Sequence, residues 1–187
     1  MVWTVPNTLT VLRIALIPVL VLVFYLPFPW SNLASTAVFG LAALTDWFDG
    51  YLARKLGQSS PFGAFLDPVA DKLIVAVALV MLVQANPKWW FVIPAAVIVG
   101  REIAISALRE WMAKIGKAKS VAVAFIGKIK TVGQMVAIPL LLYHDQLWGT
   151  VNCQVLGTVL INVAAVLTVI SMMYYLRQAL PHASEAG

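Results

Sequence analysis

The chain has 187 residues, of which 61% are hydrophobic and 11% are charged, and its mean hydropathy is +0.89. This is too apolar for a soluble domain of that length, and several uncharged runs reach the roughly 20 residues that a helix needs to cross a bilayer. The net charge of +5 does not indicate nucleic-acid binding, because that would require a soluble basic face. The composition therefore excludes a soluble globular protein and predicts a single all-α integral membrane domain over residues 1–187.

Six apolar stretches predict six transmembrane helices joined by short links. In chain order they cover residues 8–26, 33–56, 66–85, 89–113, 125–143 and 150–176. In the third stretch, Pro68 disfavours helical geometry at Asp67, so we expect a kink or the start of the helix there. The short polar segment Leu180–Gly187 is predicted to be a flexible tail.

Six crossings place both termini on the same side of the membrane, and the basic residues indicate which side that is. Lys88 is the only Lys or Arg in or beside the three links of the opposite face. The terminal face carries eight basic residues, which are Arg54, Lys55, Lys114, Lys117, Lys119, Lys128, Lys130 and Arg177. Because positive residues concentrate in cytoplasmic loops, both termini are expected in the cytoplasm.

Four of the eight acidic residues fall within one window of 26 residues, at the end of the second predicted helix and the start of the third. Spacings of i, i+3, i+4, i+7 and i+8 share one helix face, and here they hold Asp46, Asp49, Gly50, Ala53 and Arg54. Gly63, Asp67 and Asp71 follow at intervals of four residues. Inside a membrane, four uncompensated carboxylates would cost roughly 10 kcal/mol, at about 3 kcal/mol each. A positive charge must therefore lie between them.

Divalent metal ions are the natural candidate for that charge, because carboxylate oxygens are hard ligands and bound cations keep crowded carboxylates ionised. Gly50 and Ala53 leave the helix face nearly bare, which lets a phosphate or nucleotide approach the backbone, and Arg54 offers a guanidinium for a phosphate. Alone, these three residues would better suit a helix-packing seam and a snorkelling cap. Beside four acids, the pattern favours a metal-dependent phosphate site.

The residues from Asp46 to Asp71 fit the pattern D-x2-D-G-x2-A-R-x8-G-x3-D-x3-D at all eight fixed positions, and so the chain resembles the CDP-alcohol phosphatidyltransferase family. The resemblance implies a six-helix membrane enzyme that transfers a phosphatidyl or phosphoalcohol group from a CDP-linked donor and releases CMP. It implies two divalent cations, Mg²⁺ or Mn²⁺, held by Asp46, Asp49, Asp67 and Asp71, with Asp71 as the general base. The implied CDP site comprises Asp46, Asp49, Gly50, Ala53, Arg54, Gly63, Asn7 and Thr10.

No Ser, Cys or Lys within the motif is a plausible covalent nucleophile, which favours direct in-line attack by the acceptor hydroxyl. Asn7, Thr8 and Thr10 better suit a different role, as the N-cap of the first helix. The motif itself does not distinguish between acceptor alcohols, so other residues must determine the acceptor.

Charged residues of the fourth predicted helix help to indicate which alcohol is the acceptor. Arg101 and Arg109 lie about 80° apart around a helix, and guanidiniums within a membrane are costly unless they meet anions. Their partners are either protein carboxylates, namely the motif or Glu102 and Glu110, or the phosphate of an acceptor.

Three further stretches, Pro6–Thr10 with Arg13, Gly100–Ala113 and Ile126–Thr131, resemble the bacterial branch of the family that makes phosphatidylglycerophosphate. This resemblance implies CDP-diacylglycerol as the donor and sn-glycerol 3-phosphate as the acceptor. The implied acceptor site comprises Arg101, Ser106, Arg109, Lys128 and Lys130. Lys128 and Lys130 point about 200° apart on a helix, so only one of them is expected to face the pocket.

The same resemblance implies a multi-pass protein of the bacterial inner membrane, surrounded by lipids, with its active site facing the cytoplasm and a homodimeric assembly. Two alternatives stay open from the residues alone. A divalent-cation transporter would also bury carboxylates in apolar helices, although it has no need of Arg54, Arg101 and Arg109. Another family member, of the serine, inositol phosphate or cardiolipin type, would share the acidic motif but not the Arg and Lys stretches.

Overall fold

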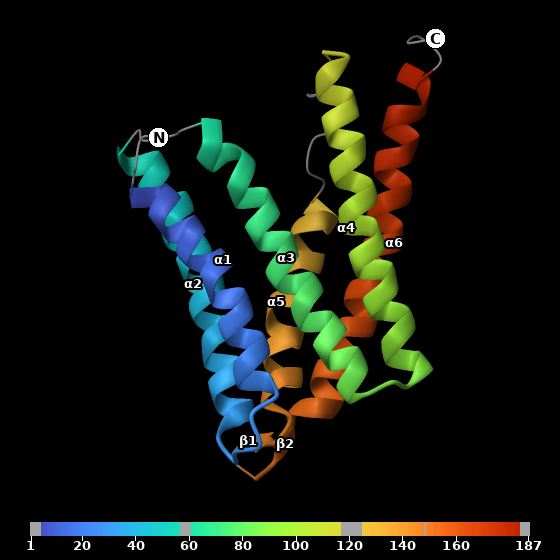
Figure 1. The fold of residues 1–187 in the computed structure, drawn as a ribbon. Coiled ribbons are helices and arrows are strands. Elements are labelled where there is room, and N and C mark those ends of the chain that lie inside the picture. Colours follow the sequence, from blue (N-terminus) through green and yellow to red (C-terminus); the bar gives the residue numbers. More distant parts are fainter. Residues whose placement is uncertain (1–4, 57–60, 117–124, 148, 184–187) are drawn as a thin grey trace. The chain divides into compact units, whose positions relative to one another are not determined.

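The structure is a computed structural model that describes residues 5–56, 61–116, 125–147 and 149–183. These residues form six α-helices and one two-stranded sheet (Figure 1). The helices are α1 (Val5–Phe24), α2 (Ser31–Leu56), α3 (Pro61–Ala85), α4 (Trp89–Lys114), α5 (Phe125–Tyr143) and α6 (Cys153–Ala183), and the strands are β1 (Gln146–Leu147) and β2 (Val151–Asn152). For this part of the chain, the prediction of a helical protein with six helices is confirmed.

Proline residues explain the largest difference at a helix start. α3 begins at Pro61 and continues through Pro68, so of the two expectations for Asp67 the helix start is wrong, and a kink stays a prediction. Proline is well suited to the first helical position, because the backbone N–H that proline lacks would have no hydrogen-bond partner within the helix there. Internal prolines are tolerated in apolar helices of membrane proteins, and the other helices that contain one hold Pro18, Pro94, Pro139 and Pro181.

The boundaries of α6 also differ from the prediction. Strand β1 pairs antiparallel with β2, with Gln146 opposite Asn152, so α6 begins at Cys153 and not at residue 150. Gly149 in the turn has a φ of 69°, a conformation that glycine adopts without strain. At the other end α6 continues to Ala183, so residues 180–183 are helical and the predicted tail begins too early.

The chain divides into two compact units. The first unit comprises Met1–Ala85 and Ile138–Leu156, and the second comprises Asn86–Ala137 and Gly157–Gly187. In the first unit α1 packs along both α2 and α3, whereas α2 and α3 make few contacts with each other. α1 is therefore the central helix of the first unit, and its side chains can reach both neighbours.

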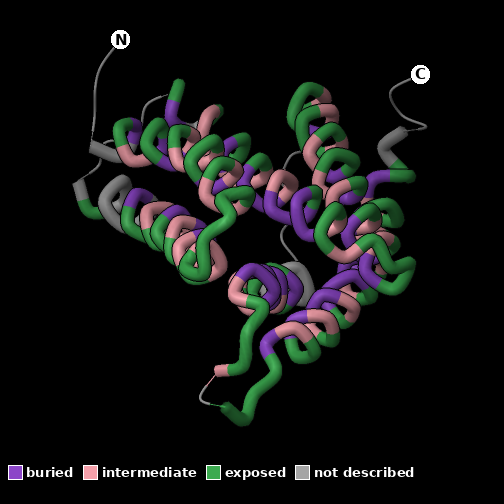
Figure 2. The backbone as a smooth tube through the Cα atoms, turned by 60° about the horizontal axis from the view of Figure 1, so that its bottom comes forward, coloured by how far each residue is buried: buried purple, intermediate pink, exposed green. Residues whose placement is uncertain are grey.

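Each unit has its own buried residues, and the colours of Figure 2 show buried and exposed residues alternating along the helices. In the first unit the large buried side chains include Leu20, Phe39 and Leu79. In the second unit, Met112 of α4 and Tyr175 of α6 belong to one buried cluster. This cluster also contains Ala179, which anchors the last turns of α6.

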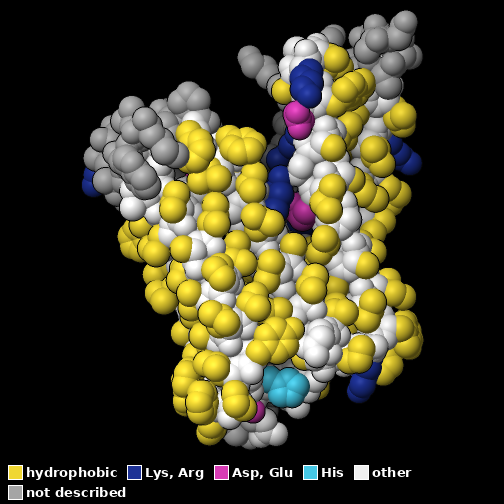
Figure 3. All heavy atoms as spheres, viewed as in Figure 1, with side chains coloured by type: hydrophobic (Ala, Val, Ile, Leu, Met, Phe, Trp, Pro, Cys, Tyr) yellow, Lys and Arg dark blue, Asp and Glu magenta, His cyan; other side chains and the backbone are white. Residues whose placement is uncertain are grey.

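Large hydrophobic side chains are exposed on all six of these helices, and they cover much of the face seen in Figure 3. Soluble monomers rarely expose extended apolar surface. Within the described residues, three helical segments are long and apolar enough to cross a membrane, at Asn7–Phe24, Trp89–Lys114 and Cys153–Pro181. The structure therefore supports a membrane protein.

Candidate active site

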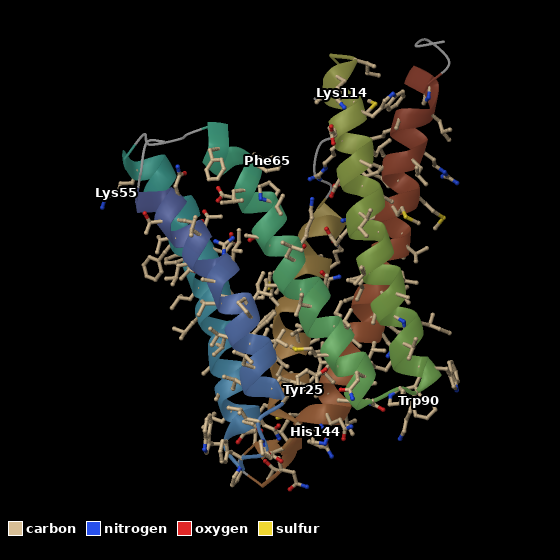
Figure 4. All side chains as sticks on the ribbon, viewed as in Figure 1. Tyr25, Lys55, Phe65, Trp90, Lys114 and His144 are labelled. Atoms are coloured by element: carbon tan, nitrogen blue, oxygen red, sulfur yellow. The ribbon has the colours of Figure 1, made fainter. Side chains whose placement is uncertain are left out.

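A single arginine of α1 gathers the acidic motif of the first unit. The Arg13 side chain is 1% exposed. Its Nη1 lies 3.0 Å from Oδ1 of Asp46 and also donates to Asp71, while Nη2 donates to Asp49. Asp46 and Asp49 belong to α2 and Asp71 to α3, so one guanidinium ties three helices together. Lys55 and Phe65, which Figure 4 labels, mark the ends of α2 and α3 near which these aspartates lie.

The fourth carboxylate of the motif meets the same face of α1. The hydroxyl of Thr10 donates a hydrogen bond to Asp67 of α3. Asn7, Thr10 and Arg13 are all buried, and their spacing of three residues aligns them along one side of the helix. Because α1 already includes Val5, Asn7 and Thr10 lie inside the helix, and their interpretation as an N-cap is wrong.

Burial within the acidic cluster is graded. Asp49 is 4% exposed, whereas the side chains of Asp46 and Asp71 are 41% and 38% exposed. Asp49 is thus enclosed by the protein, whereas a ligand can reach Asp46 and Asp71 from outside.

The remaining residues of the predicted CDP site fall on the same two helices. Gly63 is buried in α3. Gly50, Ala53 and Arg54 continue α2 beyond Asp49, but their side chains lie outside the described residues.

The cluster suits a divalent cation by its chemistry. All four side chains offer carboxylate oxygens, the ligands that Mg²⁺ and Mn²⁺ prefer. Arg13 carries one positive charge against these four carboxylates. Among the described residues, however, no three acidic, His or Cys side chains are arranged to hold a metal ion; Asp46, Asp49 and Asp71 instead contact Arg13.

Sequence reasoning did not identify Arg13 as the positive charge between the carboxylates. A signal was present: Arg13 is a lone cation in an apolar helix, and it continues a polar stripe from Asn7 and Thr10 at three-residue spacing. Only the packing of α1 between α2 and α3 shows which carboxylates it meets.

The second unit contains a cluster of opposite charge, centred on Glu102 of α4. Its carboxylate accepts hydrogen bonds from Lys130 of α5 and from Nη1 of Arg101, the latter at 3.2 Å. Arg101 Nη2 also donates to Ser171 Oγ of α6 at 3.3 Å. Arg101 and Lys130 are both buried, and Ser106 donates to the backbone carbonyl of Glu102.

Arg109 completes this basic cluster from two turns farther along α4. Its Nη2 donates to the hydroxyl of Tyr175 at 3.3 Å. Glu110, an expected partner for the arginines, instead pairs with Lys114 at 2.8 Å. Of the two lysines in α5, Lys130 points inward, and the side chain of Lys128 lies outside the described residues. The described cluster therefore places two cations on the Glu102 carboxylate and a third, Arg109, on Tyr175, and its excess positive charge suits a phosphate.

Comparison with known proteins agrees with these features. The family model for CDP-alcohol phosphatidyltransferase matches residues 3–172. The CDP-diacylglycerol–glycerol-3-phosphate 3-phosphatidyltransferases of Salmonella choleraesuis strain SC-B67 and Escherichia coli strain K12 are each 53% identical to this chain over 179 residues, which is 96% of the chain and 96% of each relative. The same enzyme of Shigella flexneri serotype 5b is equally similar, with 53% identity and the same coverage. The chain belongs to the CDP-alcohol phosphatidyltransferase family.

The pairing of Glu102 with two buried cations predicts a large effect on stability. Replacing Glu102 with Gln leaves Arg101 and Lys130 buried without their shared anion. We expect a loss of about 3 kcal/mol, the lower end of the range for breaking a buried ion pair, because Glu102 is itself 23% exposed. Thermal unfolding in detergent micelles measures this. Glu110→Gln, which breaks an exposed pair on the same helix, is the matched control, and equal shifts for both variants would contradict the assignment.

Proposed function

We propose that this chain transfers the phosphatidyl group of CDP-diacylglycerol to sn-glycerol 3-phosphate, giving phosphatidylglycerophosphate and CMP. The observation that carries the proposal is the 53% identity over 96% of the chain to enzymes named for that reaction. The chain is then a CDP-diacylglycerol–glycerol-3-phosphate 3-phosphatidyltransferase of phospholipid biosynthesis. Membership of this family leaves the divalent-cation transporter without support.

On the donor side, Asp46, Asp49, Asp67 and Asp71 are the proposed ligands of two divalent cations, Mg²⁺ or Mn²⁺. When bound, such ions clamp a pyrophosphate and offset the charge on the attacking and leaving oxygens. Arg13 and Thr10, which lie along one side of α1, contact carboxylates of both α2 and α3, which supports their acting as one site. The proposed CDP-binding residues beside them are Gly50, Ala53, Arg54, Gly63, Asn7 and Thr10, together with Asp46 and Asp49.

The proposed reaction is a single in-line displacement. A hydroxyl oxygen of glycerol 3-phosphate forms a bond to the β-phosphorus of the donor, and the bond from that phosphorus to the oxygen of CMP breaks. Asp71, as the general base, takes the proton of the attacking hydroxyl. Its carboxylate is partly exposed and fixed by Arg13, which supports a base that is both accessible and oriented.

On the acceptor side, the proposed phosphate ligands are Arg101, Ser106, Arg109, Lys128 and Lys130. A phosphate monoester carries close to two negative charges at neutral pH. Arg101 and Lys130 share the carboxylate of Glu102, and Arg109 contacts the hydroxyl of Tyr175, so a phosphate dianion would offset the positive charge of this cluster. In addition, the Nε of Arg101 is buried and has no hydrogen-bond partner among the described residues. A neutral acceptor such as serine would not require this arrangement.

The proposed location is the bacterial inner membrane, with six membrane-spanning helices, both termini and the active site on the cytoplasmic side, and a homodimeric assembly. The three apolar segments long enough to cross a membrane support the location in a membrane. The asymmetric distribution of Lys and Arg supports the orientation.

The acceptor can be tested directly with purified protein in detergent micelles. Offered CDP-diacylglycerol with labelled glycerol 3-phosphate, serine, inositol phosphate and glycerol in parallel, the protein should form a labelled lipid only with glycerol 3-phosphate. Glycerol is the matched control, because it has the reacting hydroxyls but lacks the phosphate that the basic cluster binds. A labelled lipid formed as fast with serine or inositol phosphate would refute the proposed acceptor.

The metal-binding role of the motif predicts that Asp46→Asn, Asp49→Asn and Asp67→Asn each abolish transfer while the protein still folds, because each change removes one ligand charge. Asp145→Asn, at an exposed aspartate outside the motif, should leave the rate unchanged. Transfer rates measured as a function of Mg²⁺ concentration, with circular dichroism as a check on folding, provide the test. Motif variants that stay fully active with an unchanged Mg²⁺ dependence would rule out the metal assignment.

A further inference from the structure

Tyr175 of α6 contacts both arginines of the basic cluster. The Cζ atoms of Arg101 and Arg109 each lie 5.5 Å from the centre of its ring, within the distance at which a guanidinium is attracted to an aromatic face. The Tyr175 hydroxyl also accepts the hydrogen bond from Arg109 at 3.3 Å. One side chain thus meets two cations that start two turns apart on α4.

The surroundings of Tyr175 make it a rigid support. The residue is 0% exposed and packs in the buried cluster with Ile105 and Met112 of α4 and Ala179 of α6. A tyrosine has two side-chain torsions, whereas an arginine has four and loses more freedom when it is fixed. Because the ring is locked by packing, it can restrict the two longer side chains that touch it.

Two like charges held close together repel each other unless something offsets them. The electron-rich ring face and the Glu102 carboxylate do so here, since Arg101 contacts both. An acceptor phosphate that meets an assembled pair of arginines binds more tightly than one that must first order them.

We propose that Tyr175 is a positioning residue that holds Arg101 and Arg109 together for the phosphate of the acceptor, an inference that rests on the proposed function. Tyr175 lies beyond residues 3–172 that the family model matches, in a helix for which the sequence suggested no functional role. It does not touch the reacting atoms and acts through the two arginines.

The test compares Michaelis constants for the two substrates in the full-length protein. Tyr175→Leu removes the ring and should raise the KM for glycerol 3-phosphate about tenfold, as expected for the loss of two cation–π contacts, while the KM for CDP-diacylglycerol stays within about twofold of wild type. Tyr175→Phe keeps the ring and should fall between wild type and Tyr175→Leu. An unchanged acceptor KM in both variants, or equal increases for both substrates, would overturn the proposal.

Two controls separate positioning from a general loss of structure. Ile161→Ala removes a fully buried side chain of α6 that is not part of the cluster around Tyr175, and Tyr174→Leu changes the exposed neighbouring tyrosine. Loss of folded protein lowers the apparent kcat, so these variants should leave the acceptor KM unchanged. An acceptor KM that rises as much in Ile161→Ala as in Tyr175→Leu would show that the effect is structural and would refute positioning by Tyr175.

A double-variant comparison keeps the test decisive if Tyr175→Leu does not fold. Tyr175→Phe should raise the acceptor KM about threefold in the wild-type background, as for the loss of one hydrogen bond, and should have no effect in Arg109→Gln, where the donor is already gone. The same increase in both backgrounds would refute the proposal.

The failure of this proposal can be told apart from the failure of the proposed function. If Arg101→Gln and Arg109→Gln each raise the acceptor KM and Tyr175 variants do not, only the positioning role is wrong. If neither arginine variant changes the acceptor KM, the acceptor site itself is wrong, and the role of Tyr175 falls with it.

Discussion

The buried guanidinium of Arg13 is the interaction on which the first unit depends. Carboxylates within an apolar protein cost about 3 kcal/mol each on membrane-insertion scales, so a cluster of four cannot persist without a nearby cation. Arginine suits this position because its planar group carries five N–H donors and stays charged, whereas lysine offers a single point charge. The contacts of Arg13 with Asp46, Asp49 and Asp71 bind α1 to α2 and to α3. α2 and α3 themselves make few contacts with each other.

In the second unit the charges are reversed, and a buried cluster of cations is compensated by a carboxylate. There a carboxylate, Glu102, lies between Arg101 and Lys130, and the ring of Tyr175 supports Arg101 and Arg109. Each cluster is only partly neutralised by its central group. In the proposed reaction the acidic cluster binds the divalent cations and the basic cluster binds the phosphate of the acceptor, and both interactions would offset charge during transfer of a phosphatidyl group to a phosphorylated alcohol.

Much of this arrangement could be predicted from the sequence, because it depends on local patterns. Long apolar runs gave the six helices, and the three- and four-residue spacing of the motif indicated which residues share a face. One misplaced boundary has a local cause, because Pro61 can begin a helix. The other does not, because the end of α6 packs through Ala179 against residues of α4 that are distant in the sequence. The roles of Arg13 and Tyr175 could not be predicted, because each depends on contacts with residues far away in the sequence that no periodicity encodes.

The central claim, that Arg13 compensates the acidic motif, can be tested by a double-mutant cycle between Arg13 and Asp49, the most buried of its partners. Unfolding free energies are measured in detergent micelles for wild type, Arg13→Gln, Asp49→Asn and the double variant. Arg13→Gln alone should lose about 3–5 kcal/mol, as for removal of one partner from a buried ion pair. The double variant should lose at least about 1 kcal/mol less than the two single losses combined, because Asp49→Asn removes the buried carboxylate that Arg13→Gln leaves without its cation. Losses that add to within about 0.5 kcal/mol would contradict the account and show that Arg13 does not hold the carboxylates together.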